Sequence, residues 1–235
     1  SSAHGQGHHT TFAQVAADVL GIDFDRIEVR HGDTDEVARG GGTGGSRSLQ
    51  VGGVAVHRAS EAVVEEAKRV VGGLLEASAH DVVLDIESGG FSVAGSPTVH
   101  VGWSEVAAEA GRIGEQLAEE VDFQPSGATF PFGVHASVVE VDRETGEVTV
   151  LRHVACDDAG IIVNPPIVDG QVHGGIAAGV AQALMEEFRY ADDGTPLTTN
   201  FMDYGIVSAV ELPFFERIVQ ETPTDVNPLG VKGIG

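Results

Sequence analysis

The feature that most constrains this fold is a glycine-rich run directly ahead of a long helical pattern. Residues 40–48 read Gly-Gly-Gly-Thr-Gly-Gly-Ser-Arg-Ser, so five of the first six are glycine. Glycine has no Cβ, so the loop can take positive φ and approach a ligand closely, while the following helix offers unpaired N–H groups. The side chains of Ser46, Arg47 and Ser48 can serve the same oxygens. The run predicts an anion site, usually for phosphate, although a surface linker can have the same composition.

The charge balance limits what can bind this chain. Its 235 residues include 13 Lys and Arg against 36 Asp and Glu, a formal net charge of −23. This argues against nucleic acid or an anionic membrane as a partner, so a phosphate must be held locally. The single Cys156 excludes an internal disulfide and favours a reducing compartment. Because no apolar run approaches the ~18 residues of a membrane span, we expect a cytoplasmic protein without one.

A second glycine-flanked segment lies near the start of the chain. Residues 5–10 read Gly-Gln-Gly-His-His-Thr and lead into a helical pattern. We expect Thr10 to cap this helix and Gly21 to end it. Gln6, held between two glycines, offers a donor and an acceptor to the edge of a planar heterocycle. The glycines between His4 and His8 argue against a metal bound by these two histidines.

A third segment combines glycine and glutamine. Residues 164–175 read Asn-Pro-Pro-Ile-Val-Asp-Gly-Gln-Val-His-Gly-Gly and open a helical pattern that continues to Phe188. We therefore expect Gln171, like Gln6, at a helix start. Three such helix starts suggest one extended ligand with both anionic and heterocyclic parts, because a phosphate alone would not need the two glutamines.

The rest of the chain predicts an α+β fold. We expect a strand over residues 27–30, a helix over 47–71, short strands over 82–86, 90–93 and 98–101, a helix near 104–110 and a hairpin over 132–156. Trp103 should lie in the core or anchor the start of a helix. Cys156, Asp157 and Asp158 are interpreted as a turn, because no histidine lies at a useful spacing. We expect mixed small subdomains, 1–125 and 126–235, with glycine-rich loops at helix N-termini forming one cleft.

The three segments above and a fourth motif at the C-terminal end of the sequence occur together, in order, in one enzyme family. They are residues 5–8, 42–48, 170–175 and the C-terminal Asn-Pro-Leu-Gly-Val-Lys-Gly-Ile-Gly of residues 227–235. In this order they resemble the molybdenum hydroxylases: xanthine dehydrogenase, aldehyde oxidase and, most closely, the large subunit of aerobic carbon monoxide dehydrogenase-like enzymes. The resemblance implies a bound molybdopterin with molybdenum, commonly as the cytosine dinucleotide. The implied cofactor-binding residues are Gly5, Gln6, Gly7, His8, Thr43, Gly44, Gly45, Ser46, Arg47, Ser48, Gln171, Val172 and His173.

The resemblance also implies an oxidoreductase that acts on aldehydes, N-heterocycles or carbon monoxide with oxygen taken from water. Its expected partners are the rest of the large subunit, an FAD-binding medium subunit and a 2Fe-2S small subunit. No catalytic residue is implied within the chain, because the family's general-base glutamate would directly follow Gly235. We therefore expect a cofactor-binding region, truncated at both ends and inactive by itself.

Two other classes of function compete with this interpretation. A nucleotide-type phosphate-binding enzyme would need a lysine before the serine or threonine that ends the glycine loop, where this chain has Arg47 before Ser48. A non-catalytic interaction domain could also use an acidic, glycine-rich surface.

Overall fold

The computed structural model describes residues 1–37 and 40–234, which divide into two compact units. Unit 1 comprises Ser1–Ala128 with Asp225–Leu229, and unit 2 comprises Thr129–Thr224 with the residues from Gly230 onward. Gly235, which ends the predicted C-terminal motif, lies outside the described residues. Among the helices described, none is both long and apolar enough to cross a bilayer.

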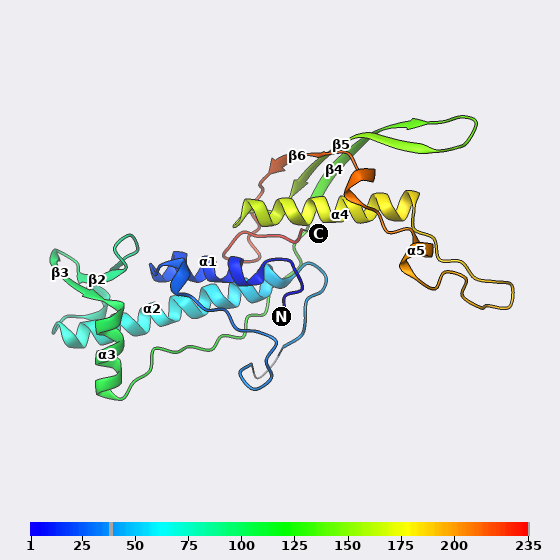
Figure 1. The fold of residues 1–235 in the computed structure, drawn as a ribbon. Helices are drawn as coiled ribbons and strands as arrows, with labels where there is room; N and C mark the ends of the chain where they lie inside the picture. Colours follow the sequence, from blue (N-terminus) through cyan, green and yellow to red (C-terminus); the bar gives the residue numbers. More distant parts are fainter. Residues whose placement is uncertain (38–39, 235) are drawn as a thin grey trace. The chain divides into compact units, whose positions relative to one another are not determined.

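Unit 1 is built around two helices, α1 (His8–Leu20) and α2 (Val54–Leu74), which lie side by side (Figure 1). The predicted Thr10 cap is wrong, because α1 begins at His8, after Gly7 in the left-handed conformation with φ of 79°. The earlier start stacks the His8 ring on Phe12 at a centroid distance of 5.0 Å, and both side chains are buried. Gly21 ends α1 with φ of 60°, which confirms the predicted C-terminal cap.

The helix that follows the glycine run begins with a π-helical turn, η2 (Leu49–Gly53), before α2. The single regular helix expected from residue 47 is therefore wrong in its first turns. Glycine is needed there, because a Cβ on Gly53 would lie 2.5 Å from Cδ1 of Leu49. A Cβ on Gly52 would lie 3.1 Å from Cζ of Phe12, so the ring of Phe12 in α1 contacts bare backbone at this turn.

An antiparallel sheet and a third helix complete the core of unit 1. The strands β1 (Val82–Asp85), β2 (Gly90–Val93) and β3 (Ser96–Gly102) pair in that order, and α3 (Trp103–Ile113) follows. These elements confirm the three predicted strands and the predicted helix. Trp103 anchors the start of α3, since its ring packs against the fully buried Phe91 and its Nε1 donates to the Leu20 carbonyl over 2.8 Å.

The strand predicted over residues 27–30 is wrong. The preceding turn η1 (Phe24–Arg26) leads into an extended segment that pairs with no strand of residues 1–37 and 40–234. Arg30 instead forms exposed ion pairs with Glu28 and Glu36. The alternating pattern indicated an extended backbone, which forms a sheet only where a second strand supplies hydrogen bonds.

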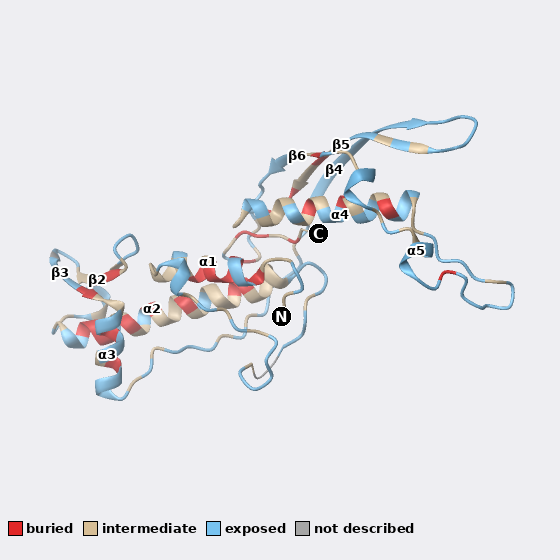
Figure 2. Ribbon diagram, in the orientation of Figure 1, coloured by how far each residue is buried: buried red, intermediate tan, exposed pale blue. Residues whose placement is uncertain are grey.

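Unit 2 is a three-stranded sheet with one long helix on one face (Figure 1). The strands β4 (Phe132–Val141) and β5 (Val148–Asp158) form the predicted hairpin, and β6 (Phe215–Gln220) runs parallel to β5. The helix α4 (Pro165–Leu184) buries Val172 and Ile176 against Ala155 and Phe215, whereas most of β4 is exposed (Figure 2). The remaining short elements are η3 (Ala79–Asp81), α5 (Phe201–Tyr204) and η4 (Ala209–Glu211).

Two predicted boundaries in unit 2 are wrong. Residues 156–158 belong to β5 and not to a turn, because they pair with β4 on one side and β6 on the other. Gln171 lies in the second turn of α4 and not at a helix start, because α4 begins at Pro165. There the Asn164 side chain accepts a hydrogen bond from the Ile167 N–H over 3.1 Å, so Asn-Pro-Pro forms a better helix start than the later glycines. Taken together, helices and two separate small sheets confirm the α+β class.

Candidate cofactor-binding site

The first two predicted segments lie in the same region of unit 1. The Thr43 hydroxyl donates to the Ser2 carbonyl over 2.7 Å and lies 3.1 Å from the Ser48 hydroxyl. The Thr43 side chain thus links the two ends of the loop 43–48 to each other and to the first residues of the chain. At the other side of this region, the contact of Phe12 with Gly52 brings the start of α1 against the helix that follows the loop.

The loop 43–48 contains two consecutive residues in the left-handed conformation. Gly45 and Ser46 are both left-handed, with φ of 64° and 50°, which is uncommon for a serine. For a non-glycine residue such as Ser46 this conformation costs about 1–3 kcal/mol, and it is often found at ligand sites. A Cβ on Gly45 would lie 3.5 Å from Nε of Arg47, so the guanidinium lies close to the loop, while the space beside Gly44 is open within 4 Å. Consecutive backbone N–H groups, two hydroxyls and one guanidinium at such a turn can bind an anion.

Next to the start of α1, three side chains bury polar atoms that have no hydrogen-bond partner among the described residues. These atoms are Nε2 of Gln6 and both ring nitrogens of His8 and of His31. His8 is only 4% exposed, and the His31 ring lies 6.2 Å from it and 4.4 Å from His9 between centroids. An unpaired buried polar group costs about 1–3 kcal/mol. The residues present therefore fit a ligand that supplies the missing hydrogen bonds.

The protonation state of His8 follows from its surroundings. Burial is the largest cause that lowers the pKa of His8 from its ordinary value, and His31, the N-terminal amine, His4 and His9 lower it further. His8 is therefore neutral near pH 7, with one donor and one acceptor nitrogen. The Gln6 carbonyl oxygen already accepts a hydrogen bond from the His4 N–H over 2.7 Å. Consequently the amide nitrogen of Gln6 is the group left to donate to a ligand.

The third predicted segment lies in unit 2, on α4. Val172 is 5% exposed and part of the core, so its side chain packs against the sheet. The His173 ring lies 5.8 Å from Phe215 and 6.1 Å from Phe214 between centroids, while Gln171 is half-buried. Whether Gln171 and His173 share a ligand with the loops of unit 1, and whether a cleft forms there, stay predictions.

A hydrogen-bonded chain that sequence reasoning missed crosses the β4–β5 hairpin. The Ser137 hydroxyl lies 2.7 Å from Nδ1 of His153, Nε2 of His153 lies 3.2 Å from Nδ1 of His135, and Nε2 of His135 lies 3.0 Å from Oδ1 of Asp157. The expectation that no histidine is usefully placed near Asp157 is therefore wrong. The signal was the strand alternation, which puts His135 and Ser137 on one face of β4, but the pairing register was needed to connect them with β5.

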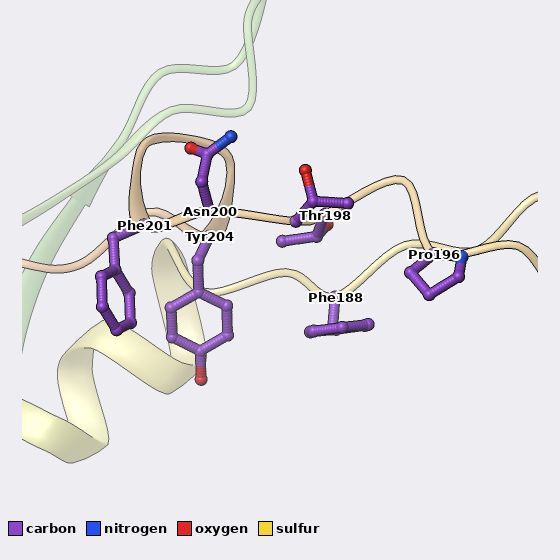
Figure 3. Close-up of a pocket in the computed structure, with 7 residues that line it drawn as sticks. Phe188, Pro196, Thr198, Asn200, Phe201 and Tyr204 are labelled. Atoms are coloured by element: carbon purple, nitrogen blue, oxygen red, sulfur yellow. The ribbon is translucent and has the colours of Figure 1, made fainter.

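An apolar hollow of about 530 Å³ lies in unit 2, lined by α5 and by residues of the loop that precedes it. In Figure 3 the rings of Phe188, Phe201 and Tyr204 project to one side of the loop. The Tyr204 hydroxyl donates to Oε2 of Glu186 over 2.9 Å, and this hydrogen bond raises the pKa of Tyr204. Since no residue of the predicted cofactor site lines this hollow, the polar cluster of unit 1 remains the better candidate site.

A glycine loop near buried ring and amide nitrogens that have no hydrogen-bond partner among the described residues is the arrangement expected of a site for an extended, acceptor-rich ligand. The family to which the chain belongs is more specific. The model of the molybdopterin cofactor-binding domain matches residues 1–213, and the chain is therefore a member of that family. This confirms the resemblance to the molybdenum hydroxylases.

Individual relatives agree with this family. The chain is 36% identical, over 98% of its length, to the carbon monoxide dehydrogenase large chain of Hydrogenophaga pseudoflava. It is 38% identical, over its whole length, to the nicotine 6-hydroxylase large subunit of Paenarthrobacter nicotinovorans. The solved structure of a Cu,Mo-CO dehydrogenase matches all of the chain with a TM-score of 0.90 and 35% identity. The chain spans 29% of each of the two curated relatives and 30% of the solved chain.

Proposed function

We propose that the chain binds molybdopterin in its cytosine dinucleotide form, as the cofactor-binding part of an oxidoreductase large subunit. The observation that carries the proposal is the set of buried nitrogens of Gln6 and His8, which have no hydrogen-bond partner among the described residues, together with the nearby loop that holds Ser46 in the left-handed conformation. A dinucleotide has the phosphate oxygens that suit this loop and a heterocycle that suits the amide of Gln6.

Each segment has its own role in this proposal. The backbone of Gly44 and Gly45 with the side chains of Thr43, Ser46, Arg47 and Ser48 holds phosphate oxygens. Residues 5–8 hold the pterin or its phosphates, and Gln171 and His173 hold another part of the dinucleotide, with Val172 contributing mainly through packing in the core. When bound, the cofactor supplies oxidation–reduction chemistry at molybdenum with oxygen from water, and this chain's residues bind and orient it.

The substrate and the partner subunits extend the proposal to the whole protein. The relatives include a carbon monoxide dehydrogenase large chain and a nicotine 6-hydroxylase large subunit, which supports carbon monoxide or an N-heterocycle as substrate, while an aldehyde is implied by the resemblance alone. A large subunit of this kind would pass electrons to a 2Fe-2S small subunit and an FAD-binding medium subunit. The general-base glutamate that we expect directly after Gly235 would act within the same subunit.

The direct test is the composition of the complete large subunit, purified with its partner subunits. We expect molybdenum and, after acid hydrolysis, cytidine monophosphate in equimolar amounts with the subunit. Arg47→Ala should lower both together, because it removes a charged donor from the phosphate site. Arg143→Ala, in the exposed turn between β4 and β5, is the matched control and should retain both. A wild-type protein without molybdenum and pterin would overturn the proposal.

A further inference from the structure

We propose that His31 is a further ligand-binding residue, which shares one phosphoryl group of the bound ligand with Gln6 and His8. The inference rests on the proposed function of this region, and it adds a residue and a ligand chemistry to it. Its basis is that both ring nitrogens of His31 are buried without a partner among the described residues, as are those of His8.

The turn that carries His31 lies against the residues that lead into the site. A Cβ built on Gly32 would lie 3.9 Å from Cβ of Ser2, and the Ser2 carbonyl accepts the hydrogen bond of Thr43. The His31 ring contacts His9 and approaches His8 edge-on, with 79° between the ring planes. His31 is thus close both to the start of α1 and to the segment that Thr43 binds.

The free groups around this point are mostly donors. The Gln6 amide nitrogen can only donate, and each imidazole ring carries at least one N–H donor. The N-cap of α1, Gly7, forms no side-chain cap hydrogen bond, so the first turn of this 13-residue helix offers its N–H groups and the positive end of its dipole. An acceptor-rich anion matches this set, and a phosphoryl group offers several oxygens in the space of one group.

The acidic residue Asp33, which follows His31 on the same turn, is hydrogen-bonded within that turn. Oδ1 of Asp33 accepts a hydrogen bond from the Asp35 N–H over 2.9 Å, and the Asp33 carbonyl accepts one from the Val37 N–H over 2.8 Å. One carboxylate oxygen and the carbonyl of Asp33 are therefore engaged within their own turn. This leaves the imidazole of His31 as the ligand-facing group of the segment.

A ligand-binding role and a purely structural role for His31 predict opposite effects of its replacement on the stability of the cofactor-free protein. If the ring only filled space and bonded within the protein, replacing it would destabilise the cofactor-free form. Because its nitrogens are unpaired there, His31→Leu removes two unsatisfied polar atoms and keeps the volume similar. The cofactor-free variant should therefore melt at the wild-type temperature or above it.

The experiment uses the complete large subunit with its partner subunits, produced in cells that cannot make the cofactor. Inorganic pyrophosphate is the probe, and its binding is measured by calorimetry alongside thermal unfolding. We expect His31→Leu to weaken pyrophosphate binding about tenfold or more, since a hydrogen bond to a charged group is lost. His31→Gln keeps a donor and should recover part of the affinity. His80→Leu, at an exposed histidine of the same unit, should change neither quantity.

Three results would overturn the inference: no pyrophosphate binding by the wild type, equal binding by His31→Leu, or weaker binding by His31→Leu together with a lower melting temperature of its cofactor-free form. Failure of the proposed function gives a different result. A wild type that contains molybdenum and cytidine monophosphate, together with a His31→Leu variant that binds pyrophosphate normally, refutes only the role of His31. A wild type that carries no molybdenum, but whose pyrophosphate binding depends on His31, refutes only the cofactor assignment.

Discussion

The Nζ atom of Lys232 lies 3.4 Å from Oδ2 of Asp158, and both side chains are buried. The other carboxylate oxygen of Asp158 accepts hydrogen bonds from the N–H groups of Gly160 over 2.7 Å and of Thr222 over 3.1 Å. Nζ of Lys232 also lies 5.0 Å from the centroid of the Phe132 ring. This ion pair holds the C-terminal segment of the chain against the end of β5 in unit 2.

Removing one partner of this pair should be costly. Asp158→Asn leaves the Lys232 ammonium buried without its counter-ion, and we expect a loss of about 3–5 kcal/mol in the free energy of unfolding. Denaturant titration measures this. The double variant Asp158→Asn, Lys232→Met should regain part of the loss, because no charge then remains buried. Asp192→Asn, at an exposed aspartate, is the control. A single-variant loss below about 1 kcal/mol would contradict a role of the pair in stability.

The carboxylate of Asp158 should make the free energy of unfolding depend on pH in the acid range. Burial by itself raises the pKa of Asp158, but the hydrogen bonds from Thr222 and Gly160 and the charge of Lys232 outweigh it, so the folded-state pKa is lowered. The contribution of Asp158 to the free energy of unfolding is therefore complete above about pH 3.9, the pKa of an aspartate in the unfolded chain. It is lost as the pH falls from there through the lower pKa of the folded state. The stability difference between wild type and Asp158→Asn should shrink below about pH 4. Unfolding curves at a series of pH values give this difference, and one that grows in acid would refute the sign.

Ser137 should stabilise the hairpin through His153. Burial is the largest cause that lowers the pKa of His153, and His135 lowers it further against the opposing effect of Asp157, so the ring is neutral near pH 7. Ser137→Ala leaves the buried Nδ1 of His153 without its partner, at a cost of about 1–3 kcal/mol. Chemical denaturation at pH 7 measures the effect. The exposed Ser126→Ala serves as control, and equal stability of the two variants would count against the hydrogen bond.

Gly160 should tolerate no side chain. A Cβ there would lie 2.2 Å from the Gly230 carbonyl oxygen, and the residue has φ of 69°. We expect Gly160→Ala to lose about 3 kcal/mol, from left-handed strain and a forced displacement of the C-terminal segment. Gly146→Ala has a similar φ of 78° but no atom within 4 Å of the new Cβ, so it should show the strain of about 1–2 kcal/mol alone. Similar losses for both variants would contradict the close approach.

Gln171 is the test residue for the third predicted segment. In the complete subunit, Gln171→Ala should lower the molybdenum and pterin content, because a buried ligand group would lose a hydrogen bond worth about 1–3 kcal/mol. Gln182→Ala, an exposed glutamine on the same helix, is the matched control. Metal analysis and pterin fluorescence after oxidation give both contents. An unchanged load in Gln171→Ala would argue against direct contact.

Much of the local structure followed from sequence, and the errors have clear causes. Gly21 ended α1 as predicted, because only a residue without Cβ takes the left-handed cap at little cost. Thr10 was the wrong start, because stacking of His8 on Phe12 extends the helix by packing, which capping preferences do not include. Likewise, Asn164 began α4 well ahead of Gln171, and a pattern of small residues could not show this.

The sequence by itself determined the family, the α+β class and the glycine-rich segments, because local propensities and ordered motifs depend on residues close together in the chain. Only the tertiary structure placed His31 beside His8, and His135 between His153 and Asp157. These pairs are separated by 18 to 23 residues, so their contacts depend on strand register and loop packing. Burial is also a tertiary property, and it is burial that turns the nitrogens of Gln6, His8 and His31 from ordinary polar atoms into the strongest indication of a ligand.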